Sequence, residues 1–183
     1  MAMSLIGEGS FQSRIGGQWA DSETEAVFSD IGREPVVLEA KEGLSLINGT
    51  SQMCSYLAEA SSLATKLCDA ADAACAMSVE AIAGSHTPFD PRIHEIRHQV
   101  GQGRSASRIM GHLKSSEIKE SHADCERVQD AYSFRCAPQV HGAVLDVLDH
   151  VTNVVISDAN SATDNPLIVP DGEGGYDLSL IHI

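Results

Sequence analysis

Residues 43–83 read GLSLINGTSQMCSYLAEASSLATKLCDAADAACAMSVEAIA, with apolar side chains recurring at the three- and four-residue spacing of one helix face. Five residues of this stretch are charged, whereas average composition would put about ten in a segment of that length. We expect one long helix, or two helices joined near Asn48-Gly49 or further along, with Gly84 ending the last turn. A helix so poor in charge is apolar nearly all round, which predicts burial in something larger than 183 residues, such as a helical bundle shared between subunits.

The C-terminal half of the chain predicts a second long helix. Between residues 140 and 155, valine and leucine recur on one face, while Asp146 and Asn153 lie off that face. Asn165-Pro166 breaks the chain after this helix, and the Gly-rich residues 170–183 predict irregular structure.

Short elements are expected between the two long helices. Pro91 opens a short helix as its first residue, and Gly101 and Gly103 close it. A further short helix is expected at residues 105–113, and the polar residues 115–130 predict a region rich in loops.

The first forty residues predict a small region of mixed structure. Residues 11–19 alternate loosely around Gly16-Gly17, as in a short hairpin. Ser22 and Glu25 have the spacing of a capping box, which predicts a helix that runs to about Asp30. The whole pattern predicts a mainly α fold, an incomplete bundle of long helices with a hairpin and loop region near the N-terminus.

Composition excludes several classes of partner. The formal net charge is -14, which argues against binding to nucleic acid or to an anionic membrane, since both need clustered Lys and Arg. No apolar run reaches the roughly 18 residues of a membrane span, and no segment resembles a signal peptide. The five cysteines form no C-x-x-C pair, which is typical of reduced thiols in a cytoplasmic protein.

One short motif has the form of a zinc site. His94-Glu95-Ile96-Arg97-His98 spells H-E-x-x-H, in which two histidines one helical turn apart bind zinc and the glutamate serves as general base. Glu117 stands where some zinc peptidases have a third ligand. A helix that ends by Gly101 would leave His98 in its last turn, which weakens this metallohydrolase hypothesis, and the motif specifies only three residues. We therefore expect no metal.

Four segments, in order along the chain, carry a resemblance to a known family. They read KEGLSLINGT (41–50), PFDPRIH (88–94), VQDAYSFRCAPQVHGA (128–143, preceded by SHADC at 121–125) and NSATDNPL (160–167). Together they resemble the histidine ammonia-lyases, members of the aromatic amino acid ammonia-lyase family. The similarity runs from about Met3 to Gly172, and the first of these residues, MSLIGEG, also fits.

The resemblance implies a long-helix bundle of the ammonia-lyase type that assembles as a homotetramer and eliminates ammonia from L-histidine to give trans-urocanate. The family's electrophile is a methylidene-imidazolone, formed autocatalytically from an Ala-Ser-Gly tripeptide. This sequence contains no Ala-Ser-Gly, and Ala60-Ser61-Ser62 is its nearest approach. We therefore expect a fragment that begins just downstream of the tripeptide and is inactive alone.

The resemblance also implies roles for five residues. Arg135, helped by Asn165, would bind the substrate carboxylate, because a planar guanidinium offers two parallel hydrogen bonds. Tyr132 would accept the β proton. Gln129, one turn from Tyr132 if that segment is helical, and Asn48 would bond near the electrophile or the amino group. His141 is expected to be structural.

The expected domain boundary lies near the C-terminus. Residues 1–172 match the central portion of the family's catalytic domain, whereas residues 173–183 diverge from it and are expected to be a non-native tail. Two other functions stay open besides zinc hydrolysis: another aromatic amino acid ammonia-lyase or aminomutase, and a non-catalytic helical partner of a full-length enzyme.

Overall fold

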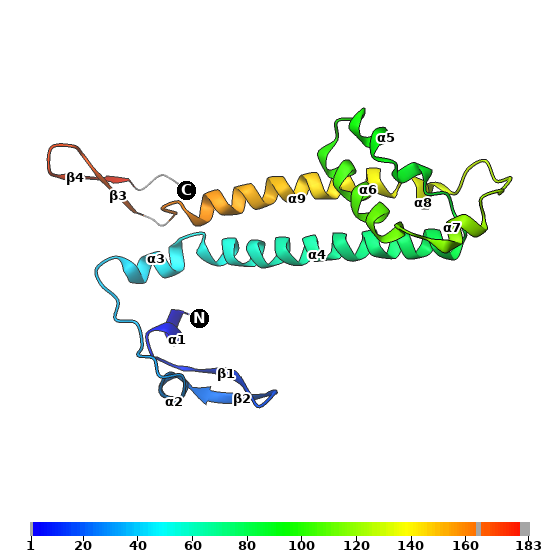
Figure 1. Cartoon of the computed structure of the whole chain (residues 1–183). Coiled ribbons are helices and arrows are strands. Elements are labelled where there is room, and N and C mark those ends of the chain that lie inside the picture. The colour runs from blue at the N-terminus through cyan, green and yellow to red at the C-terminus, as the bar shows by residue number, and fades with distance from the viewer. Residues whose placement is uncertain (1, 164–165, 180–183) are drawn as a thin grey trace. The chain divides into compact units, whose positions relative to one another are not determined.

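The computed structural model describes residues 2–163 and 166–179, most of them helical, which confirms the expected fold class (Figure 1). The chain divides into two compact units, Met1–Gln52 with Ser161–Ile183, and Met53–Asn160. In chain order the elements are α1 (Ala2–Leu5), β1 (Ser10–Ile15), β2 (Gln18–Glu23), α2 (Thr24–Asp30), α3 (Glu42–Asn48), α4 (Ser51–Ala81), η1 (Thr87–Phe89), α5 (Pro91–Glu95), α6 (Val100–Leu113), α7 (Glu117–Ser121), α8 (Tyr132–Arg135), α9 (Ala137–Ala159), β3 (Leu167–Pro170) and β4 (Tyr176–Ser179).

The N-terminal hairpin is confirmed. Strands β1 and β2 pair antiparallel around Gly16 and Gly17, whose φ angles of 59° and 88° lie in the left-handed region that glycine adopts freely. The capping box was wrong, because Ser22 belongs to β2 and its Oγ lies 2.6 Å from Ser13 Oγ across the hairpin. Helix α2 begins instead at the buried Thr24, whose Oγ1 donates to the Gly9 carbonyl over 2.6 Å.

The C-terminal residues form a second hairpin where irregular structure was expected. Strands β3 and β4 pair antiparallel, and Asp171 in the turn accepts from the backbone N–H groups of Glu173 and Gly175. A carboxylate that closes its own turn in this way compensates for the flexibility of a Gly-rich sequence.

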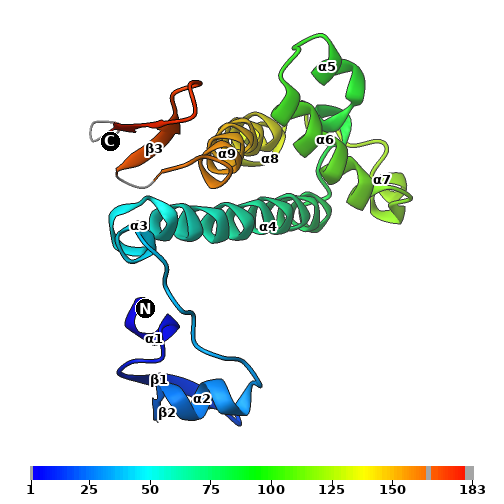
Figure 2. The same ribbon diagram turned by 90° about the vertical axis from the view of Figure 1, so that its left-hand side faces the viewer.

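The predicted long helices are confirmed. The chain breaks at the extended Gly49, so the first stretch forms two helices, α3 and α4, joined where Asn48-Gly49 indicated. Gly84 follows the last turn of α4 and donates to the Val79 carbonyl over 2.8 Å. Helices α4 and α9 lie side by side in both views (Figures 1 and 2).

The two long helices run antiparallel and are crossed by α6. Cys54 Sγ lies 3.6 Å from the Val155 carbonyl oxygen near one end of the pair, and His141 contacts Asp72 nearer the other. Where α6 meets α9, Cβ atoms on Gly101 or Gly142 would overlap the opposing backbone, so only glycines permit this approach. Asp146 of α9 then accepts from the Gly101 N–H over 2.7 Å.

This crossing overturns one expectation about the helix boundaries. Gly101 and Gly103 were expected to close the helix that begins at Pro91, but α5 ends at Glu95, and both glycines lie inside α6. Gly101 is required for contact with a distant helix rather than for a helix end.

The core of the larger unit gathers where α4, η1, α6 and α9 meet. Its buried members, with Met110 and Phe134 packed against them, are Cys75, Ala76, Val79, Phe89, Ile109, Leu113 and Ala137. Phe134 belongs to α8, so the packing of one partly buried aromatic ring attaches this short helix to the core.

Much apolar surface on the long helices stays exposed. On α4 the exposed side chains include Met53, Leu63, Leu67 and Met77. Contiguous exposed apolar surface is typical of faces that bind other chains or segments, and burial of this stretch in something larger stays a prediction. Among the described residues, no helix combines the length and the apolar character needed to cross a bilayer.

Candidate active site

Two of the five expected site residues meet on α8, a helix of a single turn. Tyr132 begins it and Arg135 ends it, and their three-residue spacing puts both side chains on one face. The guanidinium carbon of Arg135 lies 4.1 Å from the centre of the Tyr132 ring. Tyr132 is 71% exposed, whereas Arg135 is half-buried.

One hydrogen-bond donor of Arg135 is unpaired in the described part of the chain. Its Nε is buried and has no hydrogen-bond partner among the described residues. A buried N–H without an acceptor costs about 1–3 kcal/mol, so native proteins rarely leave one unpaired without a reason. The planar guanidinium, held by stacking on the Tyr132 ring, is of the kind that binds a carboxylate through two parallel hydrogen bonds.

Gln129 lies in an irregular segment, not on a helix. Ala131, the residue before α8, has an extended backbone, so Gln129 is not one helical turn from Tyr132. Gln129 is exposed and lines a cavity of about 440 Å³, together with the adjoining Asp130 and basic residues that include Lys119 and Arg127.

The other two expected residues are Asn48, which belongs to the smaller unit, and Asn165. Asn48 is the last residue of α3, next to the break at Gly49. Asn165 lies outside the described residues. The roles assigned to all five residues stay predictions.

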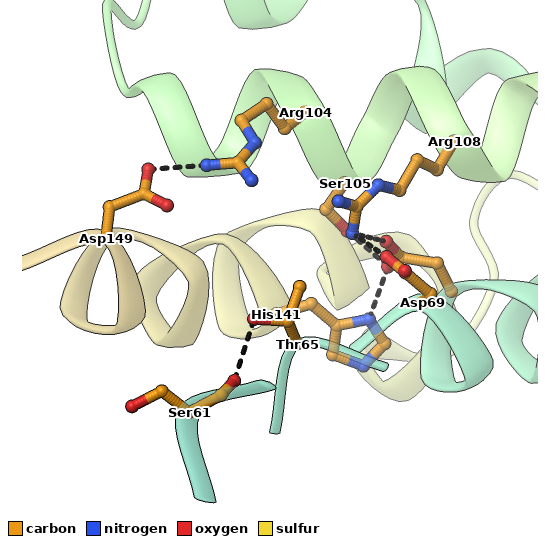
Figure 3. Close-up of polar contacts among 9 residues, drawn as sticks. Ser61, Thr65, Asp69, Arg104, Ser105, Arg108, His141 and Asp149 are labelled. Atoms are coloured by element: carbon orange, nitrogen blue, oxygen red, sulfur yellow. Dashed lines mark hydrogen bonds and ion pairs between the residues drawn. The ribbon is translucent and has the colours of Figure 1, made fainter. Parts of the chain in front are cut away.

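Sequence reasoning missed a buried carboxylate that joins three helices. Asp72 of α4 is fully buried, and its Oδ1 accepts from Ser105 Oγ of α6 over 2.6 Å and from His141 Nδ1 of α9 over 2.8 Å. Arg108 of α6 lies 3.5 Å from Asp72 Oδ2 and 2.6 Å from Asp69 Oδ1 (Figure 3).

Because His141 donates through Nδ1, it has the structural contact that was expected of it. The available signal for this network was a pair of aspartates, Asp69 and Asp72, on a helix with few other charges. Their partners come from helices far along the chain and could not be named from the sequence.

The H-E-x-x-H motif does not form a zinc-binding face. His94 is buried, its Nε2 donates to the Pro88 carbonyl over 3.0 Å, and its Nδ1 accepts from Gln102 Nε2 over 2.9 Å. Both ring nitrogens are therefore engaged. His98 lies beyond the end of α5 with a left-handed φ of 56°, so the two histidines do not share a helix face.

Several described side chains have pKa values displaced by their surroundings. Burial raises the pKa values of the Cys54, Cys68 and Cys75 thiols, with nearby aspartates acting in the same direction. Hydrogen bonds from Arg92 lower the pKa of Asp90 to about 2, so this carboxylate stays ionised at neutral pH and caps the start of α5.

A family model described as aromatic amino acid lyase matches residues 1–179. The chain belongs to the aromatic amino acid lyase family. A histidine ammonia-lyase of Sorangium cellulosum is 46% identical over 180 residues, which cover 97% of this chain and 34% of that protein.

Solved structures of the aromatic amino acid lyase type give the same result. Histidine ammonia-lyase from Trypanosoma cruzi aligns with a TM-score of 0.73 at 38% identity, over 98% of this chain and 32% of that one. Tyrosine aminomutase from Streptomyces globisporus aligns with a TM-score of 0.77 at 33% identity, over 98% and 36%. The chain thus spans about a third of the length of these relatives.

Proposed function

We propose that this chain supplies part of the active site of a histidine ammonia-lyase. The reaction would take the β proton and the amino group from L-histidine, releasing ammonia and leaving the Cα–Cβ double bond of trans-urocanate. The observation that carries the proposal is the Arg135–Tyr132 pair with its buried, unpartnered Nε. It lies in a chain 46% identical to a histidine ammonia-lyase.

The pair suits the two tasks of such an elimination. Arg135 would bind the carboxylate of L-histidine through its two parallel N–H groups, assisted by Asn165. Tyr132, stacked against that guanidinium, would then have its phenol oxygen beside the bound amino acid to take the β proton. Gln129 and Asn48 would donate hydrogen bonds to the amino group or to the electrophile.

The electrophile of this family is a methylidene-imidazolone, which makes the amine a better leaving group. The residues present do not fit its formation, because no Ala-Ser-Gly occurs among the 183 residues. We therefore propose that a segment outside this sequence supplies the group, and that this chain alone does not release ammonia from histidine.

We also propose that the assembled enzyme is a cytoplasmic homotetramer. The exposed apolar side chains of α4, such as Leu67 at 70% and Met77 at 73%, support burial against further helices. The five free cysteines support a reducing compartment.

An aminomutase is the second candidate, because a tyrosine aminomutase is among the solved structures that align well. An aminomutase would return the amino group to the β carbon, so its product would be a β-amino acid instead of an unsaturated acid. Analysis of products separates the two candidates without further assumptions.

A chimera tests the proposal. In the Sorangium cellulosum enzyme, residues 1–179 of this chain would replace the matching third, leaving the rest of that enzyme in place. Urocanate and ammonia formed from L-histidine in equal amounts would support the lyase. A β-amino acid would favour the aminomutase. A folded chimera that binds neither histidine nor another aromatic amino acid would overturn both, and activity of the isolated chain would overturn the need for an outside segment.

A further inference from the structure

Asp130 is the first anchored residue after a long exposed segment. Residues 121–129 are all exposed, and residues 125–131 form no helix or strand. The Asp130 side chain, in contrast, is only 5% exposed. It lies directly after Gln129 and two residues before Tyr132.

The Asp130 carboxylate binds the chain just after α4. Its Oδ2 accepts from the Ser85 backbone N–H over 2.6 Å, and its Oδ1 accepts from Arg127 Nη1 over 3.1 Å. A Cβ on Gly84 would stand 3.2 Å from Oδ2, so the absence of a side chain there gives the carboxylate room. A charged acceptor on a backbone N–H is a strong and directional contact.

Helix α8, which follows this segment, is attached to the core separately. Phe134 packs in the core, and Cys75 Sγ lies 4.0 Å from the Phe134 carbonyl oxygen. Only Ala131 separates Asp130 from α8, and its carbonyl accepts from the Phe134 and Arg135 N–H groups in the first turn. A shift at Asp130 would therefore reach Tyr132 through a single residue, whereas Arg135 lies beside Phe134, which packs against the core.

We propose that Asp130 is a positioning residue that holds Gln129 and Tyr132 in place by tying α8 to the end of α4. The inference rests on the proposed function for its effect on catalysis. It assigns to Asp130 no contact with substrate.

The chimera allows a direct test. Asp130→Ala should lower kcat about 100-fold, the scale expected of a displacement near 1 Å, while KM for histidine changes little because Arg135 keeps its anchor. Asp130→Asn should recover most of the turnover, since an amide oxygen still accepts from Ser85 N–H. Asp124→Ala, a change of the same kind in the same exposed segment, should have no effect.

Hydrogen exchange gives a readout that does not depend on activity. In Asp130→Ala, the amides of residues 129–133 should exchange faster than in the unchanged chimera, and those of the core helices should not. A chimera inactive in its unchanged form would count against the proposed function while exchange still tests Asp130. Unchanged exchange and turnover in Asp130→Ala would overturn the positioning role. So would equal losses in kcat and stability without recovery in Asp130→Asn.

Discussion

Arg135 and Tyr132 lie in stacking contact, with the guanidinium carbon 4.1 Å from the ring centre. The contact is worth about 0.5–1 kcal/mol at an exposed site, and it orients the guanidinium without using any of its N–H donors. The ring therefore acts on the arginine separately from its hydroxyl, which allows the two parts of the tyrosine to be tested independently.

Tyr132→Phe keeps the ring and removes the hydroxyl. In the chimera, kcat should fall about 10²–10⁴-fold, the usual contribution of a general base, while KM stays close to its original value. Steady-state urocanate formation measures both. Tyr56→Phe, at an exposed tyrosine of α4, is the matched control. Turnover close to that of the unchanged chimera would remove the hydroxyl from the reaction.

Arg135→Lys keeps the charge and removes the planar pair of donors. The kcat/KM for histidine should fall about ten-fold or more, because one ammonium cannot replace two parallel bonds to a carboxylate. Arg92→Lys changes an exposed arginine and should leave the kinetics alone. If lysine serves equally well at position 135, the carboxylate binds elsewhere.

Asp72→Ala should destabilise the chimera strongly. It leaves the buried Ser105 and the partly exposed His141 without their shared acceptor, and breaking a buried charged contact on one side costs about 3–5 kcal/mol. Asp149→Ala, which breaks the more exposed pair with Arg104, should cost less than about 1 kcal/mol. Thermal unfolding midpoints of the two variants measure the difference. Equal shifts would show that the buried Asp72 contributes no more stability than the exposed Asp149.

Gly142→Ala and Gly103→Ala should have opposite effects. A Cβ at Gly142 overlaps the backbone of Gln102, so overpacking should cost about 1–3 kcal/mol. A Cβ at Gly103 meets nothing within 4 Å, so the higher helix propensity of alanine should stabilise α6 by up to about 1 kcal/mol. Unfolding midpoints that move in the same direction would contradict the crossing described above.

The cysteines should differ in reactivity towards iodoacetamide at neutral pH. Burial raises the pKa of the Cys75 thiol and shields it, so less of the reactive thiolate forms, whereas Cys125 is exposed. Mass spectrometry of the briefly treated chimera should find label on Cys125 well before Cys54, Cys68 or Cys75. The difference should vanish in denaturant, and early labelling of Cys75 in the folded protein would argue against its burial.

Local pattern predicted much of this fold. The periodic apolar residues of α4 and α9 and the glycine pair at positions 16 and 17 each determine their own element, and all three were found where expected. The helix end predicted at Gly101 was wrong because this glycine is required for close contact with α9, some forty residues away. The capping box predicted at Ser22 was wrong because its side chain bonds to Ser13 across the hairpin instead of capping α2.

The candidate site was predicted through family likeness more than through pattern. Tyr132 and Arg135 could be paired because one helical turn separates them. The burial of Asp72 and the anchoring of Asp130 depend on Ser105, His141 and Ser85, which approach only in the folded chain. No spacing rule connects residues brought together in this way.

The crossing of α6 and α9 makes one stretch of the chain intolerant of changes in length. Gly142, Asp146 and Asp149 recur at intervals of four and three residues, and all three contact α6. One residue inserted after Gly142 would turn the rest of α9 by about 100° and remove both carboxylates from their partners at once. Natural variation along this part of the helix should therefore consist of replacements, with insertions and deletions confined to the loops.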